Sequence, residues 1–334
     1  MTSREIVKRA IHFQDPPRIP YNYDSNRTPV TEHFYGDDFI WCFLDPLTTR
    51  PEFDAKGRKV DEWGNVWATM GETFGEPIQY AYAGLEKYAD RPLPDFQNPV
   101  RYETMRKIAQ ENQGEKYLMG MLPHGLFQVM IEIFGFEGFM LEIAGNPEEF
   151  HRFLDVMCDD CIGVIHRMAD AGMDGIIIIE DMGLQDRLMI GPDMWEEFYA
   201  PRFKRMFDAA HSRGLDVISH TCGHIVDILD QYIACGLDVI QLDQQENMGL
   251  ELLSRRFRGK VCFFCPPDIQ RTTHMTREQL FERCDEMVRL LATEHGGFMA
   301  KTYPQPNAVH ITHEYMQNLA DGFAAASRKY VERS

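Results

Sequence analysis

The stretch Leu215-Asp216-Val217-Ile218-Ser219-His220-Thr221-Cys222 joins a short apolar run to a histidine and a cysteine two residues apart. Because Gly223 follows it, the run predicts a buried β-strand that ends at this point. Alternate residues of a strand project to the same face, so we expect the side chains of His220 and Cys222 to point the same way. Imidazole and thiolate are common zinc ligands, and a zinc held by three side chains keeps a fourth position open for chemistry. The stretch therefore predicts a strand that carries part of a catalytic metal site.

Runs of the same kind recur on both sides of this stretch and alternate with longer amphipathic segments. They are continuously apolar and rich in β-branched residues, as strands covered on both faces are. The runs span residues 18–22, 117–122, 174–179, 215–219, 237–242, 261–264 and 297–301. Repeated strand–helix alternation predicts a parallel α/β architecture. Seven or eight repeats, without Gly-x-Gly-x-x-Gly after the first strand, favour a (β/α)8 TIM barrel over a doubly wound sheet.

The rest of the chain indicates how this barrel is completed. We expect the eighth strand within residues 60–95. Residues 25–116 are rich in proline, glycine and aromatic residues, and we interpret them as an N-terminal insertion that covers the barrel mouth. No stretch resembles a linker, so we expect a single domain over residues 1–334. A helix is predicted over residues 192–210 with a kink at Pro201, and another begins after Thr276 as its N-cap.

The composition is that of a globular protein with an acidic surface. The 334 residues are 44% hydrophobic and 26% charged, and the formal net charge is −18. Such a surface disfavours nucleic acids and anionic membranes as partners. The first residues lack the apolar core of a signal peptide, and no stretch approaches the roughly 18 apolar residues of a membrane helix, so we expect a cytoplasmic protein. In that compartment the eight cysteines are thiols or metal ligands rather than disulfides.

The chemistry of such a barrel lies at the carboxyl ends of its strands. Those ends carry a polar set of side chains from different strands: His124, Glu180, Asp181, His220, Cys222, Asp243, Gln244, Cys265, Asp268, Thr302 and Tyr303. Cys262 and Cys265 are three residues apart on one strand and face opposite ways, so at most one of them faces the site. The spacing of Cys158 and Cys161 falls in a helical pattern, and we interpret it as an accident of a helix surface.

Four stretches, in order along nearly the whole chain, resemble the uroporphyrinogen decarboxylase superfamily. They are residues 1–5 with Ala10 and Pro16-Pro17-Arg18-Ile19-Pro20, then Asp61-Glu62-Trp63-Gly64-Asn65-Val66-Trp67, then Asp174-Gly175-Ile176 with Glu180-Asp181-Met182-Gly183-Leu184-Gln185, and finally His220-Thr221-Cys222-Gly223-His224-Ile225. That superfamily holds metal-free porphyrinogen decarboxylases and zinc-dependent methyltransferases that work with a corrinoid on a separate protein. The decarboxylase motif Arg-Gln-Ala-Gly-Arg-Tyr is absent, since this chain has Tyr21-Asn22-Tyr23-Asp24-Ser25-Asn26-Arg27. An acidic chain without that cationic motif suits a polycarboxylate substrate poorly, so the resemblance favours the methyltransferases.

The resemblance also implies a ligand set. Its zinc ligands are a His-x-Cys pair, matched here by His220 and Cys222, and a third cysteine near the last barrel strand. The last strand here, Phe298-Met299-Ala300-Lys301-Thr302-Tyr303-Pro304, has no cysteine. We prefer Glu180 as the third ligand and keep Cys265 as the alternative, although either could simply line the pocket. A carboxylate leaves zinc harder and suits an ether or alcohol oxygen, whereas a second thiolate suits activation of a thiol.

The activity that follows is transfer of a methyl group from a small methylated donor, preferably an aryl methyl ether, to the cob(I)alamin of a corrinoid protein. Zinc would act as a Lewis acid on the ether oxygen. No Asp-x-His-x-x-Gly motif occurs, so the corrinoid belongs to a partner protein. We expect His124, Asp181 and Tyr303 to orient or protonate the departing oxygen; His124 could instead be structural, and Asp181 could hold a zinc-bound histidine. Aromatic residues of the insertion would line an apolar pocket or belong to the core: Phe34, Tyr35, Trp41, Phe43, Trp63 and Trp67.

Three alternatives stay open at this point. One is transfer in the other direction, from a methyl-corrinoid to a thiol such as coenzyme M or homocysteine. Another is a decarboxylase of the porphyrinogen kind, and the third is a non-catalytic corrinoid-partner subunit that holds no stoichiometric zinc. The acidic surface is compatible with a homodimer.

Overall fold

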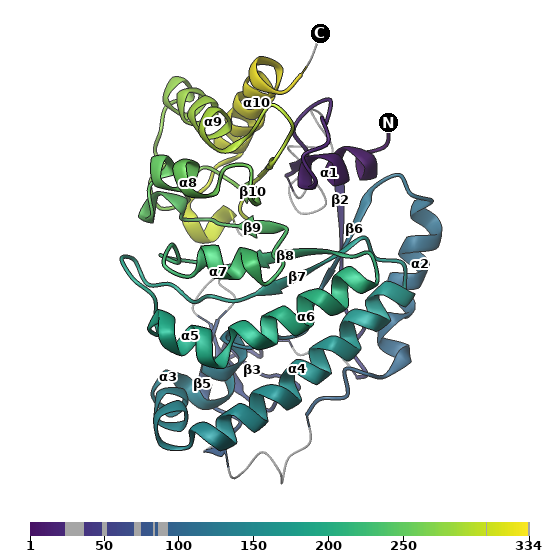
Figure 1. Ribbon diagram of the computed structural model, residues 1–334, viewed down its shortest axis with the longest axis vertical. Helices are drawn as coiled ribbons and strands as arrows, with labels where there is room; N and C mark the ends of the chain where they lie inside the picture. The colour runs from purple at the N-terminus through teal and green to yellow at the C-terminus, as the bar shows by residue number, and fades with distance from the viewer. Residues whose placement is uncertain are drawn as a thin grey trace.

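The chain folds around eight parallel strands that form a nearly closed barrel (Figure 1). The computed structural model describes residues 1–23, 37–48, 52–69, 75–82, 84–85, 93–304 and 306–332. The hydrogen-bonded strand order is β1-β11-β10-β9-β8-β7-β6-β2. The strands are β1 (Tyr21–Asn22), β2 (Phe39–Cys42), β6 (Tyr117–Met121), β7 (Gly175–Ile179), β8 (Asp216–His220), β9 (Val239–Gln241), β10 (Cys262–Cys265) and β11 (Phe298–Lys301). The predicted TIM barrel is confirmed.

Helices cover the outside of the barrel, as the alternation of patterns predicts. They are α2 (Glu103–Asn112), α3 (Gln128–Gly145), α4 (Pro147–Asp170), α5 (Pro192–Phe198), α6 (Ala200–Ser212), α7 (Leu229–Ala234), α8 (Leu250–Phe257), α9 (Arg277–Leu291) and α10 (His313–Tyr330). Thr276 caps α9 as expected, and its hydroxyl accepts the backbone N–H of Gln279. The segment predicted as one kinked helix is two, because α5 ends before Pro201 and α6 begins beside it. No helix among these ranges is long and apolar enough to cross a membrane.

The barrel interior is filled by alternate residues of the strands. They form one buried apolar cluster: Phe39, Tyr117, Met119, Ile177, Ile218, Val239, Cys262, Phe264 and Met299. Helix α1 (Ser3–Ile11) adds Val7, Ala10 and Ile11 to this cluster. The carbonyl of Ala10 accepts the N–H of Gly297, just before β11, so α1 closes the amino end of the barrel. The opposite, carboxyl end is left for the site.

The two edge strands of the sheet, β1 and β2, are joined by Asp38 rather than by a ladder. The N–H of Asp38 donates to the carbonyl of Tyr21 at 2.9 Å, and its carboxylate accepts the N–H of Tyr21 at 2.8 Å. Arg18 adds a bidentate ion pair to the same carboxylate. We call this junction the seam. Asp37 and Trp41 add hydrogen bonds to Tyr23 and Asn22 across the same junction, and the ladder is continuous everywhere else in the order above.

Three expectations differ from the structure. The eighth barrel strand is β2, before the range 60–95; that range contributes instead to a separate antiparallel sheet of β3 (Arg58–Val60), β4 (Val66–Ala68) and β5 (Glu76–Gln79). Residues 25–116 are therefore not all insertion, because β2 is part of the barrel wall and α2 lies outside it. Cys158 and Cys161 are fully buried in α4 rather than on a helix surface.

Candidate metal centre at the barrel mouth

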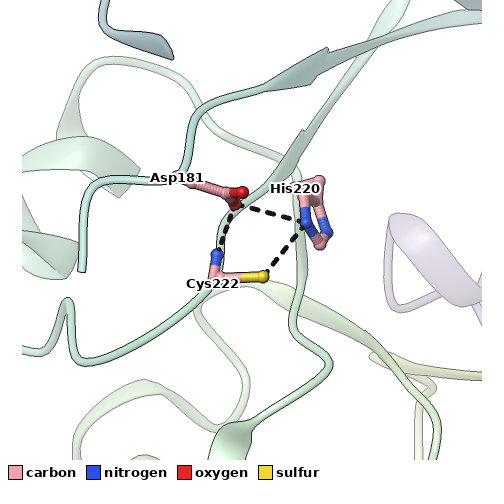
Figure 2. A group of neighbouring side chains, drawn as sticks. All are labelled: Asp181, His220 and Cys222. Atoms are coloured by element: carbon pink, nitrogen blue, oxygen red, sulfur yellow. Dashed lines mark hydrogen bonds and ion pairs between the residues drawn. The ribbon is translucent and has the colours of Figure 1, made fainter. Parts of the chain in front are cut away.

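The side chains of Asp181, His220 and Cys222 meet at the carboxyl ends of β7 and β8 (Figure 2). Nε2 of His220 lies 3.3 Å from Oδ1 of Asp181 and 3.5 Å from Sγ of Cys222. The backbone N–H of Cys222 donates to Oδ1 of Asp181 at 2.8 Å. Within the part of the chain that the structure describes, this is the one group of His, Cys, Asp and Glu side chains whose ligand atoms all lie within 4.8 Å of one another.

The strand register explains why these side chains converge. Ile218 points into the barrel core, so His220 points inward two residues later, at the mouth. His220 is paired with Ile179, and the N–H of Glu180 still donates to the carbonyl of His220 at 2.9 Å. The chain after β7 therefore keeps its alternation, and Asp181 faces inward beside His220.

Two glycines allow the loops after β7 and β8 to touch. Gly223 has φ of +77°, and a Cβ there would lie 2.2 Å from the carbonyl oxygen of Gly183. A Cβ on Gly183 would in turn lie 2.5 Å from the backbone nitrogen of His224. Only glycine permits this close approach, which holds Asp181 and Cys222 on facing loops.

The three side chains already interact electrostatically. Burial opposes the charge on Asp181, but the hydrogen bond and charge of His220 and the amide of Cys222 hold the pKa of this carboxyl below its usual value. Burial also opposes charge on His220, but Asp181 and Cys222 raise the pKa of its imidazole well above the ordinary value. Burial raises the pKa of the Cys222 thiol, with His220 acting against it. A metal cation bound between these three side chains would take the place of the proton on Nε2 of His220.

The spacing fits zinc. A tetrahedral zinc with bonds of roughly 2.0–2.3 Å places its ligand atoms roughly 3.3–3.8 Å apart. The observed 3.3 Å and 3.5 Å separations agree with that geometry. Imidazole, thiolate and carboxylate are all zinc ligands, and three of them leave a position for a substrate atom.

Glu180 lies elsewhere, because it is on the opposite face of the chain from Ile179 and Asp181. Its carboxylate accepts the backbone N–H groups of Leu126, Phe127 and Gln128 at 2.5, 2.8 and 2.9 Å. Those amides precede and begin α3, so Glu180 satisfies the donors of a helix N-terminus. Burial nonetheless raises its pKa to about 7. The structure does not bring this predicted ligand to His220.

Cys265 also faces away from the metal centre. Cys262 and Phe264 belong to the inner cluster of the barrel, whereas Cys265 belongs to the cluster between the strands and the outer helices. It is fully buried, and this burial raises the pKa of its thiol to about 12. The expectation that Cys262 and Cys265 face opposite ways is confirmed, and neither reaches His220 and Cys222.

The other predicted site residues divide between the mouth and the barrel exterior. Tyr303 is at the mouth, where burial, with smaller contributions from Asp243, Cys222 and Asp181, raises its pKa to about 12. His124 is buried outside the mouth, where Nε2 lies 3.0 Å from Asp160 of α4. Its ring packs against Trp63 and Phe96, which is a structural environment.

The mouth has one apolar wall. Trp41, Met121 and Ile179 follow the inner-cluster residues of β2, β6 and β7, and all three are partly exposed. Of the other predicted pocket aromatics, Phe43 follows β2, Trp63 packs on His124, and Trp67 lies in β4. Phe34 and Tyr35 lie outside the described residues.

Glu132 of α3 is a partly buried carboxylate that the sequence interpretation did not single out. Burial, helped by the charges of Asp61 and Asp181, raises its pKa to about 7. Gln128 donates to its Oε1 at 3.1 Å. A single carboxylate inside the apolar run Val129-Met130-Ile131-Glu132-Ile133-Phe134 was the available signal, since an acid among apolar residues is rarely placed there without a role.

Comparisons with known proteins agree with this architecture. The family model described as Uroporphyrinogen decarboxylase (URO-D) matches residues 69–295. Among solved structures, the chain is similar to a methyltransferase from Methanosarcina mazei, with a TM-score of 0.71 and 15% identity over 97% of this chain and 99% of that one. An L-ribulose 3-epimerase matches more weakly, with a TM-score of 0.44 and 11% identity over 70% of this chain and 83% of that one. No curated protein matches the chain. At 15% identity, the structure of the Methanosarcina mazei methyltransferase bears on the fold alone.

Proposed function

The chain belongs to the uroporphyrinogen decarboxylase family, and from that premise we propose that it is a zinc-dependent methyltransferase. In this proposal Asp181, His220 and Cys222 hold the zinc. The methyl group passes from a small methylated donor, preferably an aryl methyl ether, to the corrinoid of a separate protein. The observation that carries the proposal is the convergence of three zinc-ligand side chains at the mouth of the barrel.

Zinc bound there would act as a Lewis acid on the oxygen of the donor. Asp181 makes the centre harder than a second thiolate would, because carboxylate oxygen gives less electron density to zinc than thiolate sulfur does. This donor set favours an oxygen substrate over a thiol. It also weakens the alternative of transfer to a thiol, since Cys265 lies in the outer cluster.

The chain's own residues would position the donor and supply a proton. Trp41, Met121 and Ile179 offer an apolar wall against which an aromatic ring can pack. When the O–CH3 bond breaks, both electrons remain on the oxygen, which then takes a proton. Glu132, with its pKa raised to about 7, is about half protonated at neutral pH and is a candidate donor of that proton. Tyr303 is a second candidate for orienting that oxygen.

The decarboxylase alternative suits this mouth poorly. Asp181 carries a pKa below its usual value, and Asp243 lies nearby in the same region. A substrate with many carboxylates would meet like charge there. A non-catalytic subunit would make no use of a ligand set with zinc spacing.

The test measures metal content and the direction of transfer. We expect about one zinc per chain, and methylation of cob(I)alamin when the zinc-loaded protein is given a methoxylated phenol or benzoate. Turnover with methylcobalamin and a thiol, but not with the methoxylated aromatic, would reverse the proposed direction. Absence of stoichiometric zinc from a folded protein grown with zinc would overturn the proposal and support the non-catalytic subunit.

A further inference from the structure

We propose that Gln241, itself held by Asp243 and Lys301, fixes which ring nitrogen of His220 is offered to the metal. Gln241 is thus a positioning residue that acts through His220. The inference rests on the metal centre of the proposed function, although it concerns the state of the imidazole and not the methyl donor.

The contacts form a chain across three strands of the barrel. Nδ1 of His220 is hydrogen-bonded to Oε1 of Gln241. Nε2 of Gln241 donates to Oδ1 of Asp243 at 2.7 Å. Nζ of Lys301 donates to the same Oδ1 at 2.8 Å.

The barrel register brings these groups together at the carboxyl ends of their strands. His220 of β8 is paired with Gln241 of β9, and both follow inward-facing residues, Ile218 and Val239. Lys301 follows the inward-facing Met299 on β11. Gln241, Asp243 and Lys301 are buried, whereas His220 is partly exposed at the mouth. These contacts are therefore shielded from solvent, beside the metal centre.

The donor and acceptor of each of these hydrogen bonds can be assigned by starting from Lys301. The ammonium of Lys301 only donates, and the carboxylate of Asp243 accepts both from it and from its second neighbour. Gln241 must therefore turn its NH2 group toward Asp243 and its carbonyl oxygen toward His220. A carbonyl oxygen only accepts, so Nδ1 of His220 must carry the hydrogen.

This assignment determines the state of Nε2 of His220. With Nδ1 protonated, a neutral imidazole has its lone pair on Nε2, the atom that faces Asp181 and Cys222 (Figure 2). A flipped Gln241 would instead offer its NH2 group to Nδ1, which would favour the hydrogen on Nε2. It would also leave its carbonyl oxygen facing the carboxylate of Asp243, where both groups only accept. The buried Lys301–Asp243 ion pair thus selects the metal-binding form of the histidine.

Two measurements test this inference without any methyl transfer. The first is zinc affinity by competition with a chromophoric chelator, in wild type, Gln241→Met and Gln241→Glu. The second is a long-range 1H–15N correlation spectrum of the zinc-loaded protein labelled at histidine. Gln317→Met is the matched control, because Nε2 of Gln317 also donates to an aspartate, Asp321, but on α10.

We expect Gln241→Met to weaken zinc binding by about 10–100-fold, the usual effect of losing a partner behind a metal-bound histidine. Gln241→Glu still presents an oxygen to Nδ1, so it should stay closer to wild type than Gln241→Met, and Gln317→Met should match wild type. In the spectrum, the zinc-loaded His220 should carry its hydrogen on Nδ1.

The outcomes separate the two proposals. Wild-type protein that binds no zinc would defeat the proposed function. Wild-type protein that binds zinc would leave the function standing, and the inference would then be overturned by unchanged affinity in Gln241→Met or by a hydrogen on Nε2. Circular dichroism and the unfolding midpoint identify a misfolded variant, and in that case the wild-type spectrum alone decides.

Discussion

Oδ1 of Asp181 lies 3.3 Å from Nε2 of His220 and also accepts the backbone N–H of Cys222 at 2.8 Å. One carboxylate oxygen thus fixes both the side chain and the backbone of the other two members of the metal centre. This contact favours Asp181, rather than Glu180 or Cys265, as the third ligand of the proposed zinc.

Replacing that carboxylate should release the metal. We expect Asp181→Asn to weaken zinc affinity by more than about 100-fold, since partners behind a ligand alone are worth about 10–100-fold. Glu180→Gln and Cys265→Ser should each stay within about threefold of wild type, because neither side chain reaches His220. Zinc content after dialysis against a weak chelator measures all three. Loss of zinc from either of the two controls, with Asp181→Asn unaffected, would reassign the ligand.

Glu180 should matter for stability instead. Its carboxylate accepts three backbone N–H groups at the start of α3, and the NH2 group of a glutamine would face at least one of them. We expect Glu180→Gln to lower the free energy of unfolding by about 2–4 kcal/mol, since at least one buried amide then loses its carboxylate acceptor. Urea unfolding at constant zinc concentration measures the change. A difference below about 0.5 kcal/mol would mean that α3 does not depend on this carboxylate.

The buried acid Glu132 should make stability depend on pH. Its pKa is raised from 4.5 to about 7 by folding, so its contribution is fully present below pH 4.5 and is lost as the pH rises through 7. A shift of about 2.5 units corresponds to about 3 kcal/mol. The titration of all other groups, including Glu180, cancels when wild type is compared with Glu132→Gln. From pH 4.5 to 8 we expect the wild type to lose about 3 kcal/mol more than this variant in urea unfolding; parallel pH profiles would contradict the prediction.

The apolar wall of the mouth should set the preference for the donor. We expect Trp41→Leu to raise KM for a methoxylated aromatic and to lower kcat/KM roughly tenfold, because the ring loses an aromatic partner. Zinc content should not change. Trp67→Leu is the control, since its indole N–H donates to Asp61 within the small antiparallel sheet. Equal loss in both variants would point to general destabilisation rather than to substrate contact.

The architecture could be predicted because six of its strands lie in short, largely apolar runs that alternate with helical patterns. The strand β2 was missed because it has only four residues and lies in a segment rich in proline, glycine and aromatic residues. Residues 58–60, 66–68 and 76–79 do form strands, but local pattern does not reveal which sheet a strand joins. Their antiparallel pairing in β3–β5 is a matter of tertiary context.

Two members of the candidate metal centre, His220 and Cys222, were predicted as ligands, whereas Asp181 was predicted only as a residue near the departing oxygen or behind a histidine. The alternation of side chains along the strand explains this difference. His220 and Cys222 come from the same short motif, and their side chains meet as expected. The third position requires knowing that Ile179 faces inward, opposite His220; from this it follows that Asp181 faces the mouth and Glu180 does not. Gln241 carried no signal of its own, since its contacts depend on Lys301 from β11, a strand that lies far along the chain.

The seam lies on the other side of the barrel from β7 and β8, the strands that carry the proposed metal ligands. At the seam, side-chain hydrogen bonds of Asp37, Asp38 and Trp41 take the place of a backbone ladder, so we expect the ring of strands to widen there with the least loss of bonding. Between β7 and β8 the ladder is continuous, with five consecutive register pairs ending at Ile179 and His220. We therefore expect that widening of the barrel for a large ligand would occur at the seam and would leave the distances between the proposed metal ligands unchanged.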